Sequence, residues 1–295
     1  MKTAFVLSGG ASHGAIQVGM LEALYERGIE PDLIGCTSAG ALNGAFIANR
    51  PQTVETARAL GDVWVGLNRG QVFPLNPVTG ALGFLGARDH LVPDSGLRRL
   101  IRTHMSFERL EESEVPLHVI ATDVLRGEDV RLSHGPLLDA VMASAAIPGV
   151  LPAVDWNGRQ LIDGGVANNA PISHALELGA DEIYVLATGA PCQLADAPRG
   201  ALAMLISATG LLVGRRLALD VAVLSDDANV AVLPPPCPLT VQPTDFSQAE
   251  LLIDEAREDA RRYLDRARRR LVEIGRRRSP APSTAPSRRQ LPPAA

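Results

Sequence analysis

Ser38 stands where a short apolar segment, residues 31–35, gives way to a run of helix-forming residues that begins at Ala39. Its close neighbours Cys36 and Gly40 are small. This order predicts a strand, a tight turn and a helix, with the hydroxyl exposed at the bend and the first helical N–H groups directed toward it. Such a serine is either the nucleophile of an acyl-transfer enzyme or the N-cap of the helix, a position that Ser favours.

Two further turns of small residues follow segments that are predicted to be strands. Residues 9–14 (Gly-Gly-Ala-Ser-His-Gly) follow a strand at residues 3–7, and Asp163-Gly164-Gly165 follows a strand at residues 160–162. A serine hydroxyl needs a base to be an effective nucleophile, and Asp163, with room left beside it by two glycines, is the candidate base. The backbone N–H groups of Gly10 and Ala11 are candidates for binding an oxyanion.

The elements between these turns predict how they come together. Strand, glycine turn, helix and second strand within residues 3–35 form a βαβ unit, so the two strands should be parallel. Loops at the carboxyl ends of parallel strands gather along one edge of a sheet, which predicts that the three turns meet there. Further along the chain, helical and strand-like segments alternate. The sequence therefore predicts an α/β fold of three layers, with a mostly parallel central sheet flanked by helices.

Two other enzyme classes fit the pattern less well. A dinucleotide fingerprint would place Gly where Ala11 stands and an acidic residue at the end of the second strand, which closes instead with Gly35-Cys36. A Ser-acid-His triad would need a late His, but no His follows His174. His174 itself falls within a helix predicted at residues 173–178 and is interpreted as a surface residue. A Ser–Asp dyad without His fits better.

At these residues the sequence resembles the patatin-like phospholipases, a family of Ser–Asp dyad lipid acyl hydrolases. The resemblance runs from about residue 5 to residue 185 and consists of ordered blocks at residues 7–15, 17–21, 36–41, 121–123, 143–149, 162–166 and 168–171. It implies a patatin-like fold, a lipid or other acyl-ester substrate, and hydrolysis without a metal or an organic cofactor. The site residues that it implies are Ser38 as nucleophile, Asp163 as base, and Gly9, Gly10 and Ala11 around the oxyanion.

Three departures from the family pattern concern the residues that support the site. Cys36 replaces the first Gly of the usual elbow, Ala11 the third Gly of the usual triplet, and His13 a common Arg or Lys. The expected geometry holds if neither Cys36 nor Ala11 requires a positive φ. A titratable His13 predicts activity that depends on pH between about 5 and 8. The supporting residues are His13, Gly14, Cys36, Gly40, Gly164 and Gly165.

These departures leave alternatives open. A non-catalytic member that binds lipid or a partner through a disabled site is the alternative function. Cys36 is interpreted as a buried filler rather than a redox-sensitive thiol. In the two matched blocks that remain, Asp123 is interpreted as structural, and Asn169 is expected to help hold the Asp163 loop.

The domain organisation follows from composition along the chain. Residues 1–278 are predicted to form one acyl hydrolase domain, and the Pro/Ser/Ala/Arg-rich residues 279–295 a disordered tail. Residues 68–94 are either an apolar lid or a surface excursion. A helix at about 248–276 either covers the sheet with a solvated basic end or brings its arginines to an anionic membrane surface.

Composition narrows the function classes. The chain has 295 residues, is 46% hydrophobic and carries a formal net charge of −5, which argues against general nucleic-acid binding. Its three cysteines are too few and too scattered for a disulfide framework or a zinc site, and free thiols suggest a reducing compartment. The N-terminus lacks the apolar core of a signal peptide, and the longest apolar stretch, residues 201–213, is too short to span a bilayer. A cytoplasmic protein, with peripheral membrane contact as a further option, is expected.

Overall fold

The computed structural model of the protein describes residues 1–74, 76–189, 201–224 and 228–278. Within these residues eight strands form one sheet in the order β5-β6-β3-β2-β1-β7-β8, and β4 pairs with β3 outside this path. The strands are β1 (Thr3–Leu7), β2 (Leu33–Thr37), β3 (Leu117–Asp123), β4 (Glu128–Leu132), β5 (Val154–Trp156), β6 (Arg159–Asp163), β7 (Glu182–Leu186) and β8 (Asn229–Leu233). The strands predicted at residues 3–7 and 160–162 correspond to β1 and to the middle of β6.

The central part of the sheet is parallel, as predicted. Strands β3, β2, β1, β7 and β8 pair in parallel. Strands β4 and β6 are antiparallel to β3, and β5 is antiparallel to β6. The sheet is therefore mixed but mostly parallel, with its antiparallel strands gathered on the β3 side.

The antiparallel course of β6 corrects the reason given for the meeting of the three turns. The carboxyl end of β6 points the opposite way from those of β1 and β2, so Asp163 does not leave a parallel strand. Instead β6 is short and pairs with the last residues of β3, Leu161 with Asp123 and Asp163 with Ala121. Thr37 pairs with Ile120 on the same edge of β3, since β4 pairs along the other edge, so β2 and β6 approach each other end to end and bring Ser38 and Asp163 together from opposite directions.

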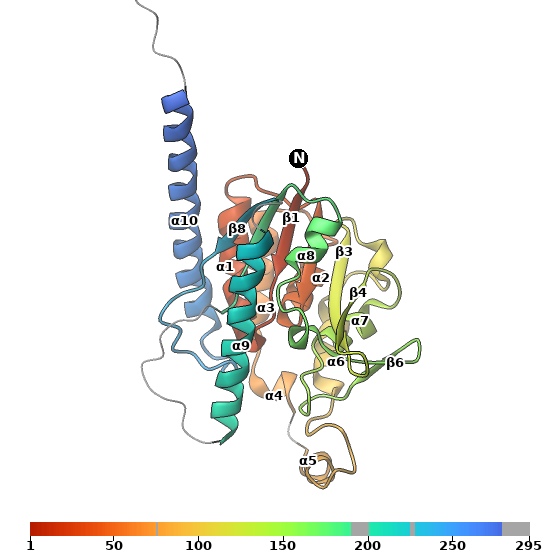
Figure 1. The fold of residues 1–295 in the computed structure, drawn as a ribbon. Helices are drawn as coiled ribbons and strands as arrows, with labels where there is room; N and C mark the ends of the chain where they lie inside the picture. The colour runs from red at the N-terminus through yellow and green to blue at the C-terminus, as the bar shows by residue number, and fades with distance from the viewer. Residues whose placement is uncertain (75, 190–200, 225–227, 279–295) are drawn as a thin grey trace, which may run out of the picture.

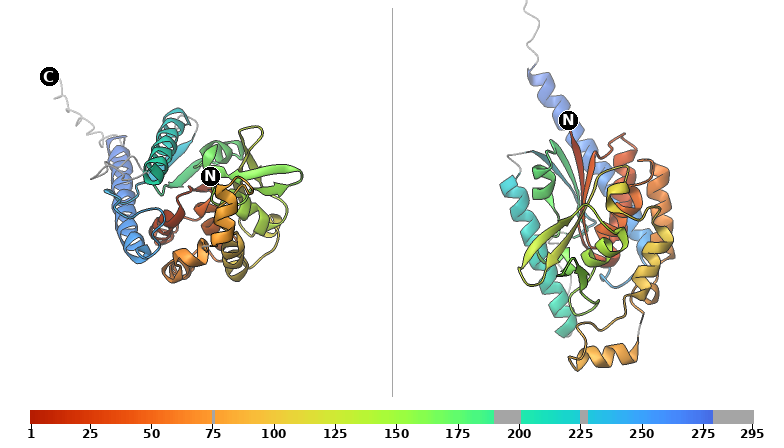
Figure 2. Two further views of the ribbon diagram at one scale, coloured as in Figure 1. Left: turned by 90° about the horizontal axis from the view of Figure 1, so that it is seen from below. Right: turned by 90° about the vertical axis from the view of Figure 1, so that its right-hand side faces the viewer.

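Helices cover both faces of the sheet, which gives the three layers (Figures 1 and 2). Alternate residues of β1 divide between two apolar clusters, as expected for a strand buried on both faces. Phe5 and Leu7 join the larger cluster, and Ala4 and Val6 join the smaller one. The helices on the larger side are α1 (Gly14–Tyr25), α2 (Ala39–Ile47), α3 (Val54–Gly66), α6 (Ser95–His104), α7 (Leu137–Ser144) and α10 (Ala249–Arg278), and those on the smaller side are α8 (Ile172–Glu177) and α9 (Ala201–Leu224).

Helix α1 is buried all round rather than on one face. All its residues are buried, including Gln17 and Glu22, because α10 packs on the side that would otherwise face solvent. A Cβ at Gly19 would lie 2.1 Å from the Ile253 carbonyl oxygen, so only Gly allows this close crossing of α1 and α10. Arg257 of α10 forms an ion pair with Glu22 at 3.2 Å. The first half of the C-terminal helix thus covers α1, while the side chains of its distal arginines lie outside the described residues.

Residues 68–94 contain two short helices, α4 (Arg69–Val72) and α5 (Pro77–Phe84), where no periodicity was evident in the sequence. Asn side chains begin both: Asn68 accepts from the Gln71 N–H, and Asn76 from those of Val78 and Thr79. The excursion returns to the domain through hydrogen bonds from the Leu91 and Val92 N–H groups to the loop after α7. It is therefore an ordered excursion in this structure.

Three other expectations can be compared with the described residues. Cys36 is a free, buried thiol, but Cys237 is disulfide-bonded, so the expectation of free thiols is wrong for Cys237. No described helix combines the length and apolar character required to cross a bilayer. The tail predicted at residues 279–295 lies outside the described part of the chain.

Candidate active site

Ser38 and Asp163, far apart in the sequence, are hydrogen-bonded in the structure. Ser38 Oγ donates to Asp163 Oδ2 at 2.6 Å, a length typical of a strong bond to a carboxylate. The second carboxylate oxygen, Oδ1, accepts from the Gly165 N–H at 2.8 Å. Both residues retain 7% exposure. The hydroxyl therefore has an acceptor of fixed orientation in a nearly water-free site.

Burial sets the protonation behaviour of this carboxyl group. Burial raises the pKa of Asp163 to about 6, while the hydrogen bonds from Ser38 and Gly165 lower the pKa and offset part of that rise. A carboxylate with a pKa near 6 is a stronger base than an ordinary Asp and is still ionised at neutral pH. The arrangement can accept a proton from the serine hydroxyl.

The turn at Ser38 is a strained elbow. Ser38 has φ 54° and ψ −120°, a backbone region that residues other than Gly rarely adopt. Its side chain makes no cap hydrogen bond to α2, which argues against the N-cap interpretation. The Ser38 N–H donates to Ser144 Oγ at 2.8 Å, and that hydroxyl donates to the Ile120 carbonyl at 2.5 Å. Ser144, at the end of α7, thus holds the elbow in place.

The glycine turn after β1 lies beside this elbow. The Gly9 N–H donates to the Asn169 carbonyl at 3.3 Å, so it is occupied. The N–H groups of Gly10 and Ala11 donate to no group in the part of the chain that the structure describes. Cβ atoms added to Gly9 and Gly10 would lie 2.9 Å from Ser38 Cβ and 2.2 Å from Thr188 Oγ1. Gly9 therefore lies directly beside Ser38, and Gly10 and Ala11 follow it with N–H groups that no described group occupies.

Ala11 does not meet the condition under which its substitution was expected to be harmless. Its φ is +50°, in the left-handed region, whereas Cys36 lies in β2 with an ordinary φ. Ala in the left-handed region costs about 1 kcal/mol relative to Gly. The third position of the turn is therefore strained in this chain.

This strain predicts that Ala11→Gly stabilises the protein. Because Gly also gains freedom in the unfolded chain, the net rise in the free energy of unfolding should be about 0.5–1 kcal/mol. Gly28, with φ +64° and open space around it, is a matched control, and Gly28→Ala should destabilise by a similar amount. Urea unfolding measures both, and a loss of stability in Ala11→Gly would contradict the strain.

A buried polar chain supports the turn from behind. Gln17 of α1 donates to the Ser8 carbonyl at 2.8 Å and the Leu186 carbonyl at 3.0 Å. Its own oxygen accepts from Asn43 of α2 at 2.8 Å, and Asn43 accepts from Trp64 Nε1 of α3 at 2.8 Å. These residues were not predicted from the sequence. The available signal was a polar Gln among the apolar residues of the first turns of α1.

His13 is an anchor rather than a group facing the dyad. Its Nε2 lies 2.8 Å from the Val241 carbonyl, and the neighbouring Ser12 N–H donates to the Pro243 carbonyl at 3.0 Å. Burial lowers the pKa of His13, and the Val241 hydrogen bond opposes that effect without cancelling it. The ring is therefore neutral at neutral pH and ties the glycine turn to residues 241–243.

The remaining supporting residues allow close approaches. A Cβ at Gly40 would lie 2.2 Å from the Leu7 carbonyl, at Gly164 2.2 Å from the Ile120 carbonyl, and at Gly14 2.6 Å from the Trp64 ring. A Cβ at Gly165 would lie 2.8 Å from Asn169 Oδ1. The structure therefore packs the three turns at van der Waals contact, with no room for side chains at these positions.

Two further residues have the structural surroundings that their interpretations require, and a third differs. Burial raises the pKa of the Cys36 thiol, so it stays protonated and fills space beside Gly44. Asp123 Oδ1 accepts the Leu125 and Arg126 N–H groups within the β3–β4 turn. Asn169 differs from expectation, because its side chain donates to the Gly9 carbonyl at 3.3 Å and so holds the glycine turn.

The described residues offer no metal site. No three of their His, Cys, Asp or Glu side chains cluster in an arrangement that could hold an ion. His174 Nε2 lies 2.7 Å from Asp129 Oδ2 of β4, and the hydrogen bonds of Ser38 and Asp163 do not include it. The chemistry available here is that of the serine, the carboxylate and the backbone donors.

Comparison with known proteins adds the following similarities. The profile of the family described as patatin-like phospholipase matches residues 5–176. Lysophospholipase nte1 of Aspergillus terreus is 28% identical over 191 residues, which cover 62% of this chain and 12% of that protein. An uncharacterized NTE family protein of Mycobacterium bovis is 31% identical over 182 residues, 61% of this chain and 47% of that protein. Patatin-like phospholipase domain-containing protein 7 of Rattus norvegicus is 29% identical over 195 residues, which cover 63% of this chain and 13% of that protein. The chain thus spans less than half the length of these relatives.

Proposed function

The chain belongs to the patatin-like phospholipase family, and we propose that it hydrolyses acyl esters of lipids with Ser38 as nucleophile and Asp163 as general base. The observation that carries the proposal is the 2.6 Å hydrogen bond from Ser38 Oγ to a buried carboxylate. Neither partner needs another side chain for proton transfer. A serine held by an acceptor of raised pKa is the arrangement that activates a hydroxyl.

The first half of the reaction forms an acyl-enzyme. Ser38 Oγ attacks the ester carbonyl carbon while its proton passes to Asp163 Oδ2. The carbonyl oxygen becomes an oxyanion and accepts hydrogen bonds from the Gly10 and Ala11 N–H groups, each worth roughly 3–4 kcal/mol in comparable enzymes. The tetrahedral intermediate then collapses, the carbon–oxygen bond to the alcohol breaks, and the proton on Asp163 goes to the leaving oxygen.

The second half releases the acyl group. Water takes the place of the alcohol, transfers a proton to Asp163 and attacks the acyl carbonyl carbon. Collapse of the second tetrahedral intermediate breaks the bond to Ser38 Oγ, which recovers the proton from Asp163. The products are a fatty acid and an alcohol, and the enzyme returns to its starting state.

The substrate class follows from the family and its named members. Two of the relatives are called lysophospholipases or phospholipase-domain proteins, which supports a phospholipid or lysophospholipid ester as substrate. Residues 1–278 act as one unit in this proposal, because α10 packs on α1 and seats Ile253 against Gly19 inside the matched region. Contact with a membrane surface is part of the proposal, since such esters reside there.

Fluorophosphonate labelling of the purified protein tests the proposal, combined with hydrolysis of p-nitrophenyl esters of increasing chain length. A fluorophosphonate modifies only an activated hydroxyl, so the expected result is one adduct, located at Ser38 by peptide mass spectrometry, and loss of ester hydrolysis in proportion to labelling. An adduct on another serine would reject the nucleophile. No adduct and no hydrolysis would favour a non-catalytic lipid-binding protein.

The raised pKa of Asp163 predicts an acid limb in the pH profile. The carboxyl group must be ionised to accept the proton, so kcat/KM should fall about tenfold per pH unit below an apparent pKa near 6. Above pH 7 this limb should be flat. Stopped-flow or steady-state hydrolysis of a soluble ester between pH 4.5 and 8.5 measures it, with circular dichroism at each pH to exclude unfolding driven by protonation of buried His13. A limb at pH 4 would reject Asp163 as a buried base.

A further inference from the structure

Helix α5 presents an apolar face to solvent. Its most exposed large side chains are Val78 (68%), Phe84 (88%) and, directly after the helix, Leu85 (77%). With 3.6 residues per turn, the exposed positions 77, 78, 81, 84 and 85 fall within about 120° of arc, and every one of them is apolar. The opposite side carries Thr79, Gly80 and Gly83 and packs on residues 90–91. The large apolar side chains of α5 thus face solvent, and its small residues face the protein.

Contacts fix α5 at the catalytic end of the molecule. Figure 1 and the right-hand view of Figure 2 place it beyond the carboxyl ends of the parallel strands, clear of the main body. The Leu91 and Val92 N–H groups donate to the Gly149 and Val150 carbonyls, at 3.1 and 2.9 Å. The same loop accepts the Asp163 N–H through the Ala146 carbonyl at 2.9 Å. The exposed apolar face is therefore anchored to the loop that holds the candidate base.

Positive charge accompanies this apolar face. Residues 68–104 carry a net charge of +3, in a chain whose net charge is −5, from five arginines and two aspartates: Arg69, Arg88, Arg98, Arg99, Arg102, Asp89 and Asp94. Arg98 is paired with Asp94 and Asp139. Arg99 and Arg102 have no carboxylate within ion-pair distance among the described residues. The segment that contains α4, α5 and α6 is thus basic, against the overall charge of the chain.

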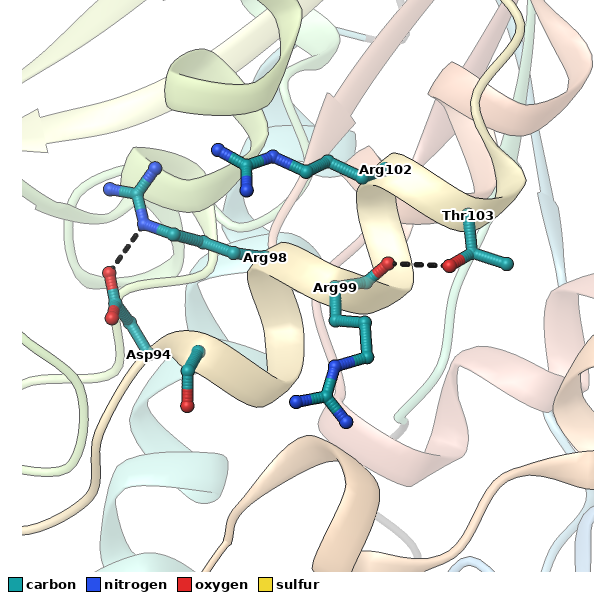
Figure 3. A pocket seen from close by; sticks show the side chains of 6 residues that line it. Asp94, Arg98, Arg99, Arg102 and Thr103 are labelled. Atoms are coloured by element: carbon teal, nitrogen blue, oxygen red, sulfur yellow. Dashed lines mark hydrogen bonds and ion pairs between the residues drawn. The ribbon is translucent and has the colours of Figure 1, made fainter.

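Arg99 and Arg102 line depressions beside α6. One depression is formed by α6 itself, with Asp94, Arg98, Arg99 and Arg102 around it, as Figure 3 shows. A second, which Arg99 also lines, reaches Gln71 and Pro74, the chain that leads into α5. Neither depression contains Ser38 or Asp163. Arg99 and Arg102 therefore line surface depressions that do not include the dyad residues.

We infer that α5 and the arginines of α6 form a docking surface for an anionic lipid bilayer, with α5 lying at the headgroup boundary and Arg99 and Arg102 at the phosphates. An apolar helix face bordered by basic residues is the pattern of helices that lie in a membrane interface. Charge complementarity favours an anionic surface over a symmetric contact with a second copy, in which this basic segment would face itself. The inference rests on the proposed function for its purpose, which is to bring the dyad to lipid esters.

Vesicle binding tests the docking surface independently of catalysis. The Ser38→Ala protein, which keeps the surface and cannot turn over lipid, is mixed with phosphatidylcholine vesicles or with equimolar phosphatidylcholine–phosphatidylglycerol vesicles and sedimented. We expect binding to the anionic vesicles that weakens as salt is raised from 50 to 500 mM. Combining Phe84→Ser with Leu85→Ser should lower the partition coefficient at least about tenfold. Combining Arg99→Gln with Arg102→Gln should lower it severalfold on anionic vesicles alone.

Matched control variants show whether the loss of binding depends on where the residues lie or only on removing exposed leucines and arginines. Leu125→Ser removes a leucine of similar exposure, 86%, on the β3–β4 turn. Arg126→Gln with Arg159→Gln removes two exposed arginines, one on that turn and one at the start of β6. Binding by these control proteins should stay within twofold of Ser38→Ala. Equal loss in controls and test variants would overturn the inference, as would unchanged binding by the Phe84/Leu85 variant. Self-association that this variant abolishes, without vesicle binding by its parent, would assign the face to a protein contact instead.

The outcomes also distinguish this inference from the proposed function. Anionic vesicle binding through α5 by a protein that hydrolyses no ester would leave the docking surface standing and reject the proposed function. Ester hydrolysis by the wild type, together with vesicle binding that the Phe84 and Leu85 substitutions do not change, would support the proposed function and reject the docking surface.

Discussion

Asp163→Asn should lower kcat/KM for a soluble ester by about 10³-fold or more and at the same time raise the melting temperature. The loss follows because an amide cannot accept the proton of Ser38 Oγ. The hydrogen-bond geometry can survive the change: the amide oxygen can accept the Gly165 N–H, and the amide NH₂ can donate to Ser38 Oγ. Steady-state hydrolysis and differential scanning calorimetry measure the two effects on the same sample.

The gain in stability follows from the raised pKa of Asp163. Its folded-state pKa of about 6 lies above the value of 3.8 for a free side chain, so ionising this buried group at neutral pH opposes folding. Two pKa units correspond to at most about 3 kcal/mol, which the neutral amide avoids. The wild type should become relatively more stable as the pH falls through 6 toward 4. The difference between the two proteins should therefore be largest at pH 7–8 and small at pH 4.5.

Asp123→Asn is a matched control for this prediction. Asp123 is also buried and accepts two backbone N–H groups, but these lie in the β3–β4 turn. Its substitution should leave the hydrolysis rate within a few-fold and should not raise the melting temperature. An Asp163→Asn protein that is active, or that is less stable than the wild type at pH 8, would show that Asp163 is not a desolvated base.

The sequence predicts the meeting of the three turns but not the route by which Asp163 arrives. Small residues after apolar segments mark Gly9–Gly14, Ser38 and Asp163, because tight turns at strand ends require them. The direction of β6 depends on its pairing with the end of β3, a contact between distant segments. Local pattern cannot distinguish a strand that leaves the catalytic edge from one that enters it.

Residues that hold the site were harder to predict than residues that form it. The Ser144 hydroxyl accepts from the elbow, the Thr188 hydroxyl donates to the Gly9 carbonyl of the glycine turn, and Gln17 supports that turn from within a buried helix. A lone Ser or Thr among small residues carries no periodicity that separates such a role from simple packing. The positive φ of Ala11 is similarly invisible, since Ala is ordinary in both helices and turns.

The outward orientation of the apolar face of α5 could not be predicted from the sequence either. Residues 77–85 are all apolar or glycine except Thr79, so no polar face marks the helix or its orientation. Periodicity arguments assume that the apolar face turns inward. A helix whose apolar face is outward violates that assumption, and such violations are expected where a surface serves a function.

Ser38→Ala and Ser38→Gly should both abolish ester hydrolysis, by on the order of 10⁴-fold or more, because each removes the attacking oxygen. They should differ in stability. At φ 54° and ψ −120° a Cβ is strained, so Ser38→Gly removes a strain of order 1–3 kcal/mol that Ser38→Ala retains. After the greater freedom of Gly in the unfolded chain is allowed for, Ser38→Gly should be the more stable by about 1–2 kcal/mol.

A glycine placed nearby without that strain should have the opposite effect. Ala41 lies three residues further on, inside α2, and Ala41→Gly should destabilise by about 1 kcal/mol or more. Urea unfolding of the three variants therefore gives the order Ser38→Gly, Ser38→Ala, with Ala41→Gly below the wild type. Hydrolysis that persists within tenfold of the wild type in Ser38→Ala would remove Ser38 as the nucleophile. Equal stability of the two Ser38 variants would leave the serine catalytic but show that its elbow stores no strain, because φ would relax once the hydroxyl is gone.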